Sequence, residues 1–158
     1  MRGHAAVVKQ LLLAGADFNA VNYFGYTALL FAAKNGHSMV VNHLLRVGAN
    51  VNHENGNEET ALLLAAWNRH SEAVQRLLQA HARVDHADKH ANTALIWAAQ
   101  NGHSAVVVDL LKYFESVNIS TKTPPTGPES AVQKGSEGLA QKISIAGRAP
   151  QKRNNADG

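Results

Sequence analysis

The chain has 158 residues and no cysteine, which excludes disulfides, thiolate zinc sites and cysteine nucleophiles. Its formal net charge of +3 lies wholly in residues 120–158, which carry six Lys/Arg against three Asp/Glu, whereas residues 1–119 carry nine of each. Because scattered charges more often solvate a chain than bind nucleic acid, this balance argues against a nucleic-acid-binding protein.

The first predicted element is a helix in residues 3–12, GHAAVVKQLL, followed by an exit loop at 14–20 in which Gly15 can end the helix. Because this pattern starts at once, no secretory signal peptide is expected, and no apolar run approaches the ~20 residues of a membrane helix. No short helix precedes this one, so it is either a makeshift cap or part of a longer array. Four apolar residues should then lack part of their cover: Val7, Val8, Leu11 and Leu12.

Three further units follow, each opening with a phrase that recurs every 33 residues and predicts a short helix: TALLFAA at 27–33, TALLLAA at 60–66 and TALIWAA at 93–99. A second phrase predicts a longer helix with a broad apolar face: NGHSMVVNHLL at 35–45, NRHSEAVQRLL at 68–78 and NGHSAVVVDLL at 101–111. N-caps are predicted just before those faces, at Ser38, Ser71 and Ser104. A fixed period of this length indicates stacked units that bury their apolar faces against one another.

Polar stretches rich in turn residues precede the short helices and predict hairpin-like loops: 19–26, 52–59 and 85–92. Hairpin, helix, loop and helix at this period resemble ankyrin repeats, and the resemblance covers roughly residues 1–119. The matching residues of the first complete unit are Gly25, Tyr26, Thr27, Leu29, Ala32, Ala33, Gly36, His37, Val40, Val41, Leu44, Leu45, Gly48, Ala49 and Asn52.

The resemblance implies an all-α ankyrin-repeat solenoid of helix–turn–helix units with β-hairpin-like loops and a disordered C-terminal tail. The expected divisions are a partial repeat at 1–21, complete repeats at 22–54, 55–87 and 88–119, and the tail at 120–158. The tail is expected to be disordered because it holds all four prolines and is rich in Gly, Ser, Thr, Lys and Gln.

Several residues depart from the family pattern. Glu58 and Ala91 stand where a turn glycine is expected, and a left-handed backbone there would cost each up to roughly 1 kcal/mol relative to Gly. Arg69 replaces the Gly of Gly-His. Phe114 and Glu115 replace the Gly-Ala that ends a repeat, so the third repeat is predicted to end irregularly.

The nine histidines invite a metal or acid–base reading. Four share one repeat position and are expected at the start of the second helices: His4, His37, His70 and His103. His53 and His86 share another position at the hairpin edges, with His90 nearby. No carboxylate or cysteine stands at a recognisable zinc spacing, so no metal or other cofactor is expected, and a pH-sensitive binding surface is the alternative. No catalytic motif is found, so no enzymatic activity is expected.

In an ankyrin-like stack, the hairpin tips and the first helices line up as a preformed strip, here called the concave strip. The predicted partner-binding residues are Tyr23, Phe24, Tyr26, Lys34, Asn57, Glu59, Trp67, Lys89, His90, Asn92, Trp97 and Gln100. Aromatic residues are the usual anchors of protein interfaces. Phe31, Leu64 and Trp97 share a repeat position and fit a core role equally well. Tyr23 and Trp67 favour binding because their equivalents in the other repeats are polar or small.

We therefore expect an intracellular, cytoplasmic or nuclear, monomeric adaptor or scaffold. It is expected to bind a protein partner of unknown identity through the concave strip. One alternative is a fragment of a larger ankyrin-repeat protein whose missing part is enzymatic or targets substrates. Another is that the tail binds nucleic acid or an anionic surface. Partner identity does not follow from the sequence, because fold does not fix function.

Overall fold

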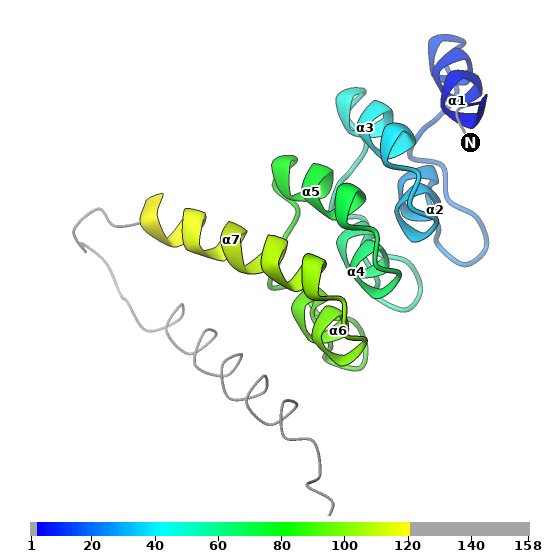
Figure 1. Cartoon of the computed structure of the whole chain (residues 1–158). Coiled ribbons are helices and arrows are strands. Elements are labelled where there is room, and N and C mark those ends of the chain that lie inside the picture. Colours follow the sequence, from blue (N-terminus) through cyan, green and yellow to red (C-terminus); the bar gives the residue numbers. More distant parts are fainter. Residues whose placement is uncertain (1–2, 121–158) are drawn as a thin grey trace, which may run out of the picture. The chain divides into compact units, whose positions relative to one another are not determined.

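The computed structural model describes residues 3–120, and within them the chain forms seven helices and no strand (Figure 1). The helices are α1 (Gly3–Leu13), α2 (Ala28–Lys34), α3 (Ser38–Arg46), α4 (Ala61–Trp67), α5 (Ser71–Gln79), α6 (Ala94–Gln100) and α7 (Ser104–Ser120). The all-α class implied by the resemblance is confirmed for these residues. The predicted tail begins at Ser120, which belongs to α7, and the rest of the tail lies outside the described residues. Among the described helices, none combines the length and the apolar character that a membrane-spanning segment requires.

The helices form two layers that run side by side (Figure 1). One layer holds the short helices, here called inner helices, in which α2 packs on α4 and α4 on α6. The other holds the longer outer helices, in which α1 packs on α3, α3 on α5 and α5 on α7. Within each complete repeat the inner helix also packs on its outer helix: α2 on α3, α4 on α5 and α6 on α7.

The core is the seam between these layers. Each complete repeat contributes one fully or almost fully buried leucine from the inner helix and one from the outer helix: Leu29 and Leu44, Leu62 and Leu77, Leu95 and Leu110. Burying a leucine side chain contributes about 1.5–3 kcal/mol. Ala33 and Ala66 are completely buried, and their small side chains let neighbouring helices approach closely. The buried residues of all complete repeats therefore form one continuous core along the stack.

The inner helices are capped by threonine. Thr27, Thr60 and Thr93 accept the backbone N–H three residues later through Oγ1, at 3.3–3.4 Å. The predicted serine N-caps are wrong, because Ser38, Ser71 and Ser104 are the first helical residues of α3, α5 and α7. The N-cap positions of α3 and α5 fall on histidine, as expected for that repeat position: His37 and His70.

The backbone is left-handed at both positions where the sequence lacks a turn glycine, with φ of 61° at Glu58 and 60° at Ala91. Arg69, which replaces the Gly of Gly-His, has φ of 63°. His81 has φ of 59° where the preceding repeat has Gly48. Each of these non-glycine residues therefore carries a backbone cost that glycine would avoid.

The third repeat ends in a continued helix. Where Phe114 and Glu115 replace the expected Gly-Ala, α7 runs on for a total of 17 residues, against nine each for α3 and α5. Phe114 is half-buried against the core. The helix continues because no glycine ends it and because Phe114 gains apolar contacts by doing so.

Candidate functional site

Each hairpin turn is held by one side-chain oxygen, supplied by Asn22, Asn55 and Asp88. In every turn this oxygen accepts the backbone N–H groups of the residues two and four positions later, at 2.9–3.0 Å. Short side chains of this type stabilise turns by such local bonds. The predicted partner-binding residues do not include these three, although an Asn or Asp recurring every 33 residues is the signal that identifies them.

Neighbouring hairpin tips are joined in a row by their backbones. Gly56 donates its N–H to the carbonyl oxygen of Phe24 at 3.1 Å, and Lys89 donates to that of Asn57 at 3.3 Å. The Lys89 ammonium adds a hydrogen bond of 2.5 Å to Oδ1 of Asn57. The tips are therefore preformed and aligned, although their side chains differ from repeat to repeat.

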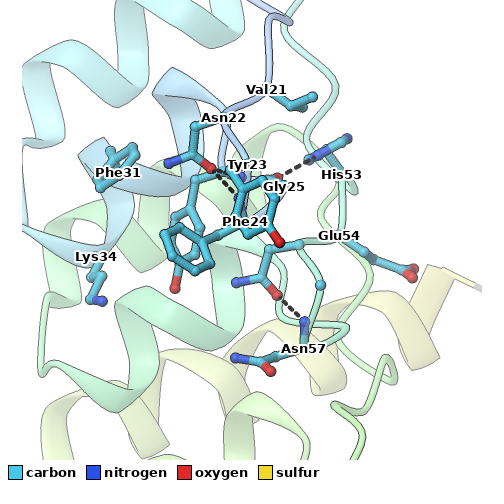
Figure 2. A pocket seen from close by; sticks show the side chains of 13 residues that line it. Val21, Asn22, Tyr23, Phe24, Gly25, Phe31, Lys34, His53, Glu54 and Asn57 are labelled. Atoms are coloured by element: carbon cyan, nitrogen blue, oxygen red, sulfur yellow. Dashed lines mark hydrogen bonds between the residues drawn. The ribbon is translucent and has the colours of Figure 1, made fainter.

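The first tip exposes two aromatic rings (Figure 2). Tyr23 is 96% exposed and Phe24 is 67% exposed, and the two rings meet edge to face with centroids 5.4 Å apart. They stand beside an open hollow of about 840 Å³ that also includes Phe31 and Lys34. An exposed aromatic pair gains little from the fold of its own chain, which marks this tip as available for contact.

Tyr26 also lines this hollow and joins two repeats. The ring centroids of Tyr26 and Phe31 are 4.9 Å apart, and Nζ of Lys34 lies 5.4 Å from the centroid of the Tyr26 ring. Its hydroxyl donates to Oε2 of Glu59 at 3.3 Å, and the side-chain amide of Asn55 donates to the same oxygen at 2.6 Å. Tyr26 and Glu59 therefore help to connect the first two repeats.

Two tryptophans from neighbouring inner helices also pack together. The rings of Trp67, the last residue of α4, and Trp97 on α6 have centroids 3.8 Å apart and planes tilted by 37°. The indole N–H of Trp97 donates to Oδ2 of Asp88 at 2.8 Å. Trp67 remains 42% exposed, so part of its ring supports the stack while the rest faces solvent.

The side chain of Asp88 is buried, and both of its carboxylate oxygens accept hydrogen bonds. Burial is the largest single influence on its pKa and raises it. The backbone N–H of Asn92, the indole of Trp97, and the N–H and positive charge of His90 together outweigh burial and hold the pKa of Asp88 below its ordinary value. The carboxylate therefore stays ionised at neutral pH and links the third tip to α6.

The repeats seen in the fold correspond to a known family pattern. A family model described as Ankyrin repeats (3 copies) matches residues 1–88 and again residues 35–123. The chain belongs to the ankyrin repeat family. Ankyrin repeats are in general protein–protein interaction modules and typically have no catalytic role. A search of curated proteins found no match to this chain.

The residues predicted to form the concave strip of the ankyrin array fall into three groups. The tips carry five exposed residues: Tyr23, Phe24, Asn57, Lys89 and His90. The residue just before each threonine cap is half-buried: Tyr26, Glu59 and Asn92. The inner helices end in three exposed residues, Lys34, Trp67 and Gln100, and half-buried Trp97 lies one turn before the last of them.

One position of the ankyrin repeat has three different environments. Leu64 is only 4% exposed and belongs to the core, whereas its equivalent Phe31 is 45% exposed and Trp97 is half-buried. Phe31 lies on α2, and within residues 3–120 no inner helix precedes α2. The predicted role in the core is therefore correct for Leu64, whereas Phe31 is open to solvent.

The hairpin histidines hold successive ankyrin repeats together. His53 and His86 direct Nε2 at the carbonyl oxygens of Gly25 and Glu58, at 3.0 and 2.8 Å. Because a carbonyl can only accept, each Nε2 must carry the hydrogen. Among the described residues no group of three or more His, Asp or Glu side chains is placed to hold a metal ion. A pH-sensitive binding surface stays a prediction.

Proposed function

We propose that this ankyrin array is a non-catalytic adaptor or scaffold that binds a partner protein through the concave strip. The observation that carries the proposal is the first hairpin tip, where Tyr23 and Phe24 are 96% and 67% exposed beside the hollow. Aromatic rings that face water on a fixed backbone are typical anchors of protein interfaces. An intracellular location and a monomeric state remain predictions from the sequence.

Comparison between the repeats supports this anchor. The positions of Tyr23 and Phe24 are filled by Gly56 and Asn57 in the second complete repeat, and by Lys89 and His90 in the third. The hairpin backbone is the same in all three, with the same pair of bonds to the Asn or Asp side chain. The hairpin therefore does not need aromatic residues here, and a binding role accounts for them.

The exposed part of Trp67 provides a second anchor further along the strip. Its ring is fixed from one side by Trp97, which is itself held by Asp88. A side chain that is already immobilised loses little conformational entropy when a partner covers it. The strip thus offers two preorganised apolar contacts, at Tyr23 with Phe24 and at Trp67, with polar tips from the second and third repeats between and beside them.

The test is the double variant Tyr23→Ala and Trp67→Ala in the full chain. Its circular dichroism spectrum should match that of the original chain, and its affinity for a captured partner should fall at least about tenfold, or roughly 1.4 kcal/mol. The matched control is Met39→Ala, which removes a side chain that is 52% exposed on the outer helix α3. Equal affinity of the folded double variant and the control would show that the strip is not the binding surface.

A further inference from the structure

The turns that join each inner helix to its outer helix share one backbone conformation. They are called junctions here and have the sequences KNGH at 34–37, WNRH at 67–70 and QNGH at 100–103. In each junction the third residue donates its N–H to the carbonyl three residues back, and the fourth donates to the carbonyl five residues back. The third residue has φ of 69° at Gly36, 63° at Arg69 and 69° at Gly102. Arg69 therefore makes the turn that glycine makes in the other two junctions.

Arg69 gains nothing visible from the fold of its own chain. A non-glycine residue in this left-handed conformation costs up to about 1 kcal/mol relative to glycine. The Arg69 side chain is exposed, and its guanidinium forms no hydrogen bond or ion pair with residues 3–120. Strain by itself does not identify a binding residue, because Ala91 has the same conformation and carries no functional group. At Arg69, however, the strained position presents a charged group that no neighbour uses.

Arg69 lies on the same turn as the second aromatic anchor of the concave strip. Trp67 opens this junction and is 42% exposed. Two residues so close in sequence lie at most about 7 Å apart along the backbone. Trp67 is replaced by Lys34 and Gln100 in the other junctions, and Arg69 by glycine. Trp and Arg are, with Tyr, the residue types enriched among those that contribute most to binding at protein interfaces. The second junction combines both of them.

Lys34 brings a second positive charge to the same place. Nε2 of His70, the residue after Arg69, lies 3.0 Å from the carbonyl oxygen of Lys34, so the first two junctions are in contact. The Lys34 ammonium lies 5.4 Å from the centroid of the Tyr26 ring, and it forms no ion pair in the described part of the chain. Histidine apart, Lys34 and Arg69 are the only charged residues of the three junctions.

The neighbouring carboxylates do not neutralise these two cations. Glu72, three residues after Arg69, is already bonded to Arg76 at 2.8 Å. Glu58 and Glu59 belong to the hairpin that precedes α4, whereas the junction follows it, and seven helical residues separate the two ends by about 10 Å. The exposed ring of Trp67 is therefore flanked by positive charge without a carboxylate of the chain to balance it.

We propose that the second junction binds an acidic residue of the partner protein, an Asp or Glu that stands next to the apolar residue covering Trp67. Arg69 holds this carboxylate, because a planar guanidinium matches a carboxylate with two parallel hydrogen bonds, and Lys34 adds to the attraction. The inference rests on the proposed function and names the chemistry of the partner at one of its two anchors. It also extends the binding surface from the concave strip to a turn beyond the end of α4.

The test starts with random dodecapeptides displayed on phage and selected on the full chain. Peptides that the original chain retains and that Trp67→Ala loses are synthesised, and their dissociation constants are measured by fluorescence anisotropy. The decisive variant is Arg69→Gly. Ala91→Gly is the first control, because it relieves the same strain without removing a charge. Arg46→Ala is the second, because it removes the same charge from an exposed position at the end of the outer helix α3. Circular dichroism checks that every variant folds.

The Trp67-dependent peptides should carry Asp or Glu beside an aromatic or aliphatic residue. Arg69→Gly should bind them at least about fivefold more weakly, while both controls stay within about twofold of the original chain. Arg69→Gly should also unfold at the same or a higher temperature, because glycine removes the backbone strain. A residue that served only the fold would not lose affinity and keep stability together. For Arg69→Glu, changing the acidic residue of the peptide to Lys should strengthen binding.

The proposal is overturned if the Trp67-dependent peptides lack Asp and Glu, or if Arg69→Gly binds them as tightly as the original chain. It is also overturned if no retained peptide depends on Trp67. In each of these cases the proposed function stands as long as some retained peptides are lost by the Tyr23→Ala, Trp67→Ala double variant. If that double variant loses none of them, the proposed function fails, and this inference fails with it.

Discussion

The indole of Trp97 and the carboxylate of Asp88 are joined by a hydrogen bond of 2.8 Å, from Nε1 to Oδ2. The other carboxylate oxygen, Oδ1, accepts the backbone N–H groups of His90 and Asn92. Both oxygens of one buried side chain are thus occupied, and together they tie the third hairpin tip to α6. Since Trp97 also supports Trp67, the same bond fixes part of the concave strip.

Replacing Asp88 by Asn should lower the free energy of unfolding by about 1–3 kcal/mol, because one donor of the network loses its acceptor. An amide has a single oxygen, so it can serve the turn or the indole but not both. Urea unfolding followed by circular dichroism measures the change. Asp85→Asn, an exposed residue three positions away, removes the same charge and should change stability by no more than about 0.5 kcal/mol. Equal effects of the two substitutions would contradict this role of Asp88.

The contribution of Asp88 to stability should depend on pH. Its pKa is lower in the folded chain than the ordinary aspartate value near 3.9, because the hydrogen bonds and the His90 charge outweigh burial. The stabilisation is therefore fully present above about pH 4 and is lost as the pH falls through the folded pKa. The difference in unfolding free energy between the original chain and Asp88→Asn should shrink on acidification below about pH 4. A difference that grows there would contradict the direction of the shift.

The left-handed positions predict a reciprocal pair of substitutions. Ala91 has φ of 60°, so Ala91→Gly should stabilise the chain by up to about 1 kcal/mol. Gly102 has φ of +69° with nothing within 4 Å of an added Cβ, so Gly102→Ala should destabilise it by a similar amount through backbone strain alone. Thermal unfolding of both variants tests this. If Ala91→Gly lowers the melting temperature, the left-handed backbone at Ala91 is not a cost to the fold.

Gly36 should be less replaceable than Gly102, although both have φ of +69°. A Cβ at Gly36 would overlap the imidazole ring of His70 in the next repeat, whose Nε2 bonds to the carbonyl oxygen of Lys34. Gly36→Ala should therefore lower the unfolding free energy by more than Gly102→Ala. In a double-mutant cycle, the excess should vanish when His70 is already Ala. An excess that persists without the His70 ring would point to another cause.

The backbone could be predicted from the sequence because each feature recurs every 33 residues. A recurring Thr-Ala-Leu phrase identified the inner helices, and the missing glycines at Glu58 and Ala91 identified two left-handed sites. The serine caps were predicted wrongly because Ser is a good capping residue in general, whereas His37 and His70 occupy the N-caps here. The His70 ring also reaches the carbonyl oxygen of Lys34 in the preceding repeat, a contact that a single helix pattern does not reveal.

The side-chain contacts of the site could be predicted only in part. Asn22, Asn55 and Asp88 recur at one position, so their role was readable from the period. The packing of Trp67 on Trp97 could not be predicted in this way, because other residue types occupy their positions in the other repeats. A shared repeat position specifies the course of the backbone but not the contacts of the side chain. Contact between the two rings depends on the spacing of α4 and α6 and on the bond from Asp88 to Trp97. The same reasoning applies to Tyr26 and Glu59, which proved to contact each other across two repeats.

The central claim is that the concave strip binds a partner protein through Tyr23 and Trp67. The most direct test captures partners on the full chain, identifies a retained protein and measures its dissociation constant by calorimetry with the original chain, Met39→Ala and the Tyr23→Ala, Trp67→Ala double variant. The account predicts equal affinity for the first two and at least about tenfold weaker binding for the folded double variant. Indistinguishable dissociation constants for all three proteins would contradict it.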